Sequence, residues 1–139
     1  FMNDYNNEVG RRLRLIRNVF NEGGKLTADQ FAFLLGETRD KITNYELGRA
    51  SIPIRLLFEL YNRGINPIYL ITGEGSCFAA NKAGSEFATK MLYRLENGYI
   101  TDRKTIALVT EFVGNFENIS SKQPVHVYKV SAGRLEKDI

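Results

Sequence analysis

The sequence has few of the residues on which many enzymes and secreted proteins depend. Its 139 residues include no tryptophan, three prolines, one cysteine and one histidine. The single cysteine, Cys77, excludes an internal disulfide, and together with the single histidine, His126, it cannot supply a familiar metal site. We therefore expect no metal and no cofactor, and we interpret the chain as a non-enzyme in which neither residue is a nucleophile or a base.

Long apolar runs are also missing. No stretch approaches the roughly 18 to 20 apolar residues that cross a bilayer, and the N-terminal segment has no apolar core like that of a signal peptide. We therefore expect a cytoplasmic protein with no membrane association. The net charge is only +3, and neither half of the chain is a basic tail. A polyanionic partner would therefore have to be bound by locally placed basic residues.

The first half of the sequence has the pattern of a compact all-α unit. Apolar residues at helical spacing alternate with polar ones, and the side chains of Thr27, Thr38 and Asn66 are typical N-terminal caps. The glycine at position 36 supplies the positive φ that a tight turn between two helices usually needs. The expected helices cover residues 8–20, 27–35, 38–47, 54–63 and 66–72.

The second half predicts a helical hairpin over residues 76–120. Residues 72–84 are rich in glycine and small side chains and suggest a joint between the two parts. Two amphipathic helices are then expected, one after the cap Ser85 and one after the cap Thr101. Because two helices alone bury little surface, this hairpin must pack on the first unit, on a second copy, or on both.

Residues 121–139 form a tail with a weak β pattern. Val125 and Val127 alternate with polar residues, as in an edge strand, before the pattern shifts. A loosely ordered tail is an equal alternative.

The helix expected over residues 38–47 has one apolar and one polar side. At 100° per residue, Ile42, Tyr45 and Glu46 share the inner side. The outer side consists of Leu47 and the polar residues Asp40, Thr43 and Asn44, and the polar Arg39 projects from the N-terminal end of the helix. Such groups match base edges in a major groove, although a plain solvated helix face has the same composition. The preceding nine-residue helix and glycine turn favour a helix-turn-helix arrangement.

These residues resemble a known family, the Xre/Cro-type helix-turn-helix transcriptional regulators of the phage-repressor-like branch. The matching positions are Leu26, Thr27, Phe31, Ala32, Leu35, Gly36, Thr38, Ile42, Glu46, Gly48 and Pro53. The stretch GINPIYLITGEG resembles the closing helix of that branch, so the resemblance covers residues 9–75. It implies an all-α, five-helix lambda-repressor-like DNA-binding domain over residues 1–75.

The resemblance also implies roles for particular side chains. An ion pair between Arg17 and Glu46 is expected to be structural. The base-reading candidates are Arg39, Asp40, Thr43 and Asn44. The phosphate-binding candidates, which lie at helix starts and in the following loop, are Thr27, Thr38, Lys41, Arg49 and Ser51.

A single domain of this size binds specific DNA weakly, so we expect a homodimer that places two recognition helices about 34 Å apart. The expected dimer contact is the apolar face of the hairpin, formed by Phe87, Met91, Leu95, Ile106, Val109, Phe112, Val113 and Phe116. Helix 27–35 has more apolar residues than one buried stripe can use, and either the hairpin or a second subunit should cover Phe33 or Leu34.

The sequence thus predicts a sequence-specific regulator that binds double-stranded DNA, in our interpretation a repressor. Two positions depart from the family pattern, because Ala28 and Leu47 replace residues that often contact DNA. They leave open an alternative, an antitoxin-like or adaptor module that binds a protein through its C-terminal region and in which DNA binding is secondary or lost.

Overall fold

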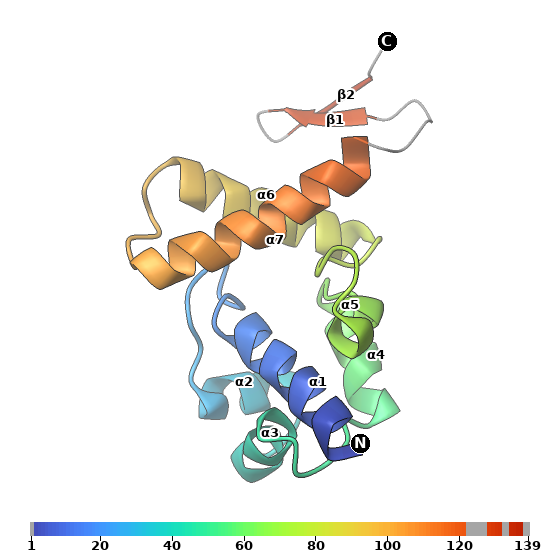
Figure 1. The fold of residues 1–139 in the computed structure, drawn as a ribbon. Helices are drawn as coiled ribbons and strands as arrows, with labels where there is room; N and C mark the ends of the chain where they lie inside the picture. Colours follow the sequence, from blue (N-terminus) through green and yellow to red (C-terminus); the bar gives the residue numbers. More distant parts are fainter. Residues whose placement is uncertain (1, 122–127, 132–133, 138–139) are drawn as a thin grey trace.

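The computed structural model describes residues 2–121, 128–131 and 134–137, with side chains described for residues 4–115. The described residues form seven helices and one small antiparallel hairpin of strands, so the expected all-α class is confirmed (Figure 1). The helices are α1 (Met2–Arg17), α2 (Ala28–Leu35), α3 (Arg39–Glu46), α4 (Ile54–Asn62), α5 (Pro67–Thr72), α6 (Lys82–Glu96) and α7 (Arg103–Ser121). None of these described helices is long and apolar enough to cross a membrane.

The helix starts in the N-terminal unit, α1 to α5, follow the expected caps. The Thr27 hydroxyl accepts a hydrogen bond from the Gln30 amide at 3.1 Å, and the Gln30 side chain accepts one from the Thr27 amide at 2.9 Å. The Thr38 hydroxyl accepts from the Lys41 amide at 3.2 Å. Between α2 and α3, Gly36 has φ 66°, a left-handed conformation that costs glycine little.

Helix α1 differs in its bounds from the expected helix over residues 8–20. It begins at Met2 and ends at Arg17, because the chain turns at residues 18–20. Gly10 lets α1 approach the last turn of α3 closely. A Cβ atom at Gly10 would collide with the backbone oxygens of Tyr45 and Glu46. The long N-terminal helix therefore supports α3 from behind.

The hairpin unit, α6 and α7, packs on the N-terminal unit. The rings of Phe20 and Phe87 meet edge to face with centroids 5.7 Å apart, as do those of Tyr69 and Phe112. One continuous set of buried apolar side chains includes residues from both units. Of the alternatives left open by the sequence, packing on the first unit is therefore the one observed within a single chain. Figure 1 shows the hairpin unit at the end of the molecule opposite α3.

The segment expected to be a joint is part of the core. Residues 76–79 are buried, and the Asn66 amide donates to the Cys77 carbonyl at 2.8 Å. The Ala79 amide likewise donates to the Gly64 carbonyl at 2.8 Å. The expected boundary between residues 75 and 76 therefore lies beside a hydrogen-bonded segment that joins the two units.

Both hairpin helices begin at other residues than expected. The cap of α6 is Asn81 rather than Ser85, because its side chain accepts from the Gly84 amide at 2.7 Å. The cap of α7 is Asp102 rather than Thr101, because its carboxylate accepts from the Thr105 amide at 2.9 Å. The Thr105 hydroxyl also donates to this carboxylate at 2.8 Å, and the hydrogen bonds from the Thr105 hydroxyl and amide lower the pKa of Asp102.

Two short strands follow α7. Strand β1 (Tyr128–Ser131) pairs antiparallel with β2 (Arg134–Lys137), with Tyr128 opposite Lys137. The alternation expected at Val125 and Val127 lies outside the described residues.

Candidate nucleic-acid interface

Helix α3 turns its apolar side inward and its polar side outward. Ile42 and Tyr45 are buried against the core. Arg39, Asp40 and Lys41 are exposed. Thr43 and Asn44, the other base-reading candidates, are half-buried on the outer side. Because the hairpin unit lies at the opposite end of the molecule, the described part of the C-terminal half does not cover this surface (Figure 1).

The expected ion pair between Arg17 and Glu46 is present and fixes the end of α3. The Arg17 Nε atom lies 2.7 Å from one oxygen of the Glu46 carboxylate, and Nη2 lies 2.9 Å from the other. Arg17 also donates from Nη1 to the Leu26 carbonyl at 2.9 Å. Both side chains are at most 9% exposed. One guanidinium thus joins α1, the segment before α2 and the last turn of α3.

A second buried carboxylate fixes the start of α3, and sequence reasoning missed it. The Glu37 side chain is 5% exposed and lies 2.7 Å from Nη2 of Arg55 on α4 and 3.8 Å from Nζ of Lys41. The Tyr45 hydroxyl is also nearby: burial, followed by the negative charge of Glu37, raises the pKa of Tyr45. The spacing of Glu37 and Lys41 was a visible signal of a helix-surface pair, but nothing local indicated Arg55.

The five phosphate-binding candidates lie around α3 in different environments. Thr27 and Thr38 are exposed at the starts of two eight-residue helices, where free backbone N–H groups attract anions. Lys41 lies 3.8 Å from Glu37, so its charge is partly offset. Arg49 is exposed, and the hydroxyl of Ser51 donates to the side-chain oxygen of Asn6 in α1 at 3.3 Å.

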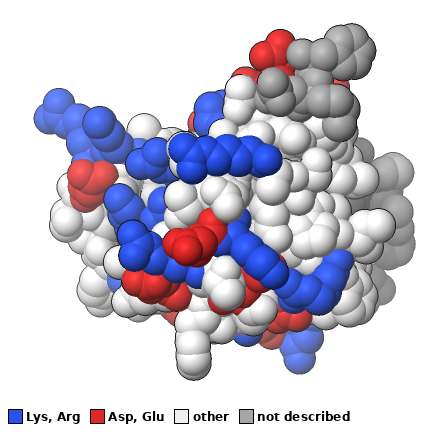
Figure 2. Space-filling model, turned by 90° about the horizontal axis from the view of Figure 1, so that it is seen from below, with Lys and Arg blue, Asp and Glu red and all other residues white. Residues whose placement is uncertain are grey.

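The charge on this side of the molecule is mixed. Figure 2 shows the molecule from below, with Lys and Arg in a broken band and acidic side chains between them. Within the described part of the chain, Arg39 and Arg49 have no ion-pair partner, whereas Lys41 and Arg55 share Glu37. Positive charge without an ion-pair partner among the described residues therefore lies at both ends of α3.

The outer side of α3 ends in an apolar side chain. Leu47, one of the two departures from the family pattern, is about half exposed beside the half-buried Asn44. The other departure, Ala28, is half-buried at the first position of α2. Neither residue blocks the outer side of α3.

The residues expected to form a dimer contact are mostly enclosed by their own chain. Met91, Val109, Phe112 and Val113 are buried in the core. The other described ones are half-buried: Phe87, Leu95 and Ile106. The side chain of Phe116 lies outside the described residues. The assignment of the four buried residues to a dimer contact is corrected, because an enclosed side chain offers no surface to a second copy.

Several large apolar side chains are exposed on the N-terminal unit instead. Phe33 is 85% exposed and Ile54 is 82% exposed. Leu34, Phe58 and Ile68 are also exposed. Within the described residues, the hairpin unit of the same chain therefore does not cover Phe33.

The side chains that could support catalysis or metal binding do not lie together in the part of the chain that the structure describes. Cys77 is buried, and burial raises the pKa of its thiol. His126 lies outside the described residues. Within the part of the chain that is described, no three His, Cys, Asp or Glu side chains are placed to hold a metal ion.

Comparisons with models of protein families, with curated proteins and with solved structures found no significant match to this chain. The interpretation of α3 therefore depends on the geometry of its outer side and on the sequence pattern.

Proposed function

We propose that this protein binds double-stranded DNA sequence-specifically by inserting α3 into the major groove, and that it acts in the cytoplasm as a transcriptional regulator, a repressor. One observation supports this most directly. The outer side of α3 is open, while a buried ion pair at its end and a buried carboxylate at its start hold the helix in place. A surface that enters a groove must be both accessible and rigid, because ordering it on binding costs affinity.

In this arrangement, the base contacts follow from side-chain chemistry. Arg39 suits the two acceptors of guanine, and Asn44 suits the donor and acceptor of adenine. Asp40 can accept from the cytosine amino group, and elsewhere it would be repelled by phosphates. Thr43 can contact either a base or the thymine methyl group. The free N–H groups at the start of α2, together with Arg49, would hold the flanking phosphates.

Selection of bound duplexes from a random pool tests this proposal. We expect a short motif to be enriched, with an affinity for the full chain that falls linearly with the logarithm of salt concentration. If repeated selection enriches no sequence, the proposed sequence-specific binding is wrong.

We also propose that the active form is a homodimer, with a contact that differs from the one expected from the sequence. Ile54, Phe58 and Tyr61 are spaced by four and three residues on α4, so they form one exposed apolar stripe. Light scattering of the wild type and of Phe58→Ser, with and without the selected duplex, tests this contact. A monomer in both conditions at high concentration would remove the dimer from the proposal.

The exposure of Phe33 supports a second candidate function, that of a protein-interaction module. The ring of Phe33, 85% exposed, and the exposed side chain of Leu34 together form a small apolar patch on α2, and apolar patches mark surfaces that a partner covers. The variant Phe33→Ser separates the two functions. If the protein is an adaptor or antitoxin-like module, this variant loses a protein partner in a pull-down, while the outer side of α3 can be altered without effect.

A further inference from the structure

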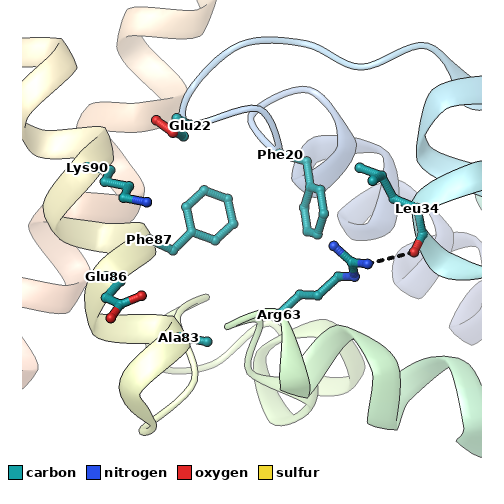
Figure 3. A pocket seen from close by; sticks show the side chains of 8 residues that line it. All are labelled: Phe20, Glu22, Leu34, Arg63, Ala83, Glu86, Phe87 and Lys90. Atoms are coloured by element: carbon teal, nitrogen blue, oxygen red, sulfur yellow. Dashed lines mark hydrogen bonds between the residues drawn. The ribbon is translucent and has the colours of Figure 1, made fainter.

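A cavity of about 290 Å³ lies where the N-terminal unit meets the hairpin unit (Figure 3). Its walls come from the turn after α1, the ends of α2 and α4, and one side of α6. This volume is just below the range of about 300 to 1,000 Å³ for ligand sites. Any ligand that fits is therefore small.

The apolar part of the cavity is built from aromatic rings. Phe20 and Phe87 are half-buried, meet edge to face with centroids 5.7 Å apart, and both line the space. Leu34, at the end of α2, adds an exposed aliphatic side chain. In water, this surface would gain from contact with an apolar group of about the size of a phenyl ring or a leucine side chain.

Charged side chains of both signs surround the rings. Lys90 from α6 and Glu22 from the turn after α1 both line the cavity, and neither has an ion-pair partner among the described residues. The other two charges are already engaged. Glu86 lies 4.0 Å from Lys82 outside the cavity, and Arg63 donates to Glu59 at 3.1 Å and to the Leu34 carbonyl at 2.9 Å.

The position of Glu22 is fixed by a tight turn. It is the one described non-glycine residue with positive φ, at 51°. The amides of Asn21 and Gly24 donate to each other's carbonyls at 3.0 and 2.8 Å and close this turn. Residues held in sparsely populated backbone regions often serve a functional site. At the other wall, Arg63 donates to the Leu34 carbonyl. One of its guanidinium nitrogens, Nη1, makes no hydrogen bond among the described residues.

We propose that this cavity binds a free α-amino acid with an apolar side chain. The ligand's carboxylate pairs with Lys90, its ammonium group pairs with Glu22, and its side chain covers the rings of Phe20 and Phe87. A ligand with only one charge would leave the other charged residue unpaired, whereas a zwitterion satisfies both. This binding is independent of the proposed contact with DNA.

Isothermal titration of the full chain with four matched probes tests the inference. L-Phenylalanine has both charges and an apolar body, 3-phenylpropionate lacks the ammonium group, 2-phenylethylamine lacks the carboxylate, and glycine lacks the body. We expect L-phenylalanine to bind with a dissociation constant below about 1 mM, and each of the other three to bind at least about tenfold more weakly. No heat with L-phenylalanine or L-leucine at concentrations of about 10 mM would overturn the proposal.

Three variants locate the site. Lys90→Met and Glu22→Gln should each weaken L-phenylalanine binding by about tenfold or more, because each removes one charge-assisted contact. Lys104→Met is the matched control, since Lys104 is an exposed lysine on the other helix of the hairpin unit and lies outside the cavity. Circular dichroism checks that all three fold. If 3-phenylpropionate binds as tightly as L-phenylalanine, or if Lys104→Met has the same effect as Lys90→Met, the assignment is wrong.

Discussion

The ion pair between Arg17 and Glu46 offers a direct test of how α3 is held. The variant Glu46→Ala leaves the Arg17 guanidinium buried, with only its hydrogen bond to the Leu26 carbonyl at 2.9 Å. Breaking a buried ion pair by removing one partner costs about 3 to 5 kcal/mol. Because the bond to Leu26 remains, we expect the lower end, about 3 kcal/mol, which lowers the melting temperature of a chain of this size by roughly 10 °C.

Urea unfolding followed by circular dichroism measures this loss, and a double-mutant cycle with Arg17→Met isolates the coupling between the two side chains. Lys82→Ala is the control, because Lys82 and Glu86 form an exposed pair at 4.0 Å that should contribute about 1 kcal/mol or less. A loss below about 1 kcal/mol for Glu46→Ala, with a coupling energy near zero, would refute the argument that this pair anchors α3.

Three further variants test the packing. Gly10→Ala should destabilise the protein by about 1 to 3 kcal/mol in urea unfolding, because its Cβ would collide with the Tyr45 carbonyl; unchanged stability would mean that α1 and α3 are not in close contact. Arg12→Met should cost about 1 to 3 kcal/mol and speed amide exchange in α5, because Arg12 donates to the Leu70 carbonyl at 2.7 Å; wild-type exchange would contradict this. Burial raises the pKa of Tyr69 to about 12, so its contribution to stability is complete below pH 10 and lost between pH 10 and 12. Tyr69→Phe should therefore lose less stability than the wild type from pH 9 to 11, and equal losses would be evidence against this.

Much of the N-terminal unit could be predicted from the sequence because its signals are local. The caps Thr27, Thr38 and Asn66 each act within three residues, and Gly36 needs only its own backbone conformation. The pair between Arg17 and Glu46 was expected only through the family pattern, since its members are 29 residues apart.

Interactions between distant segments could not be predicted in the same way. The bond from Arg55 to Glu37 spans 18 residues, and no periodicity indicates it. The starts of α6 and α7 were misplaced because Asn81 and Asp102 are also good caps, and only the fold selects between neighbouring candidates. The burial of Met91 within its own chain could not be predicted for the same reason. The apolar face of a helix does not reveal which surface covers it.

The central claim is that the outer side of α3 distinguishes base sequences. The most direct measurement is the affinity of the wild type, Arg39→Ala and Lys41→Ala for a selected duplex and for its shuffled version over a series of salt concentrations. We expect Arg39→Ala to lose about fivefold to 150-fold on the selected duplex and little on the shuffled one, whereas Lys41→Ala weakens both alike and lowers the salt slope by about 1. Equal losses on both duplexes for Arg39→Ala, or a wild type that binds both duplexes equally, would contradict the claim.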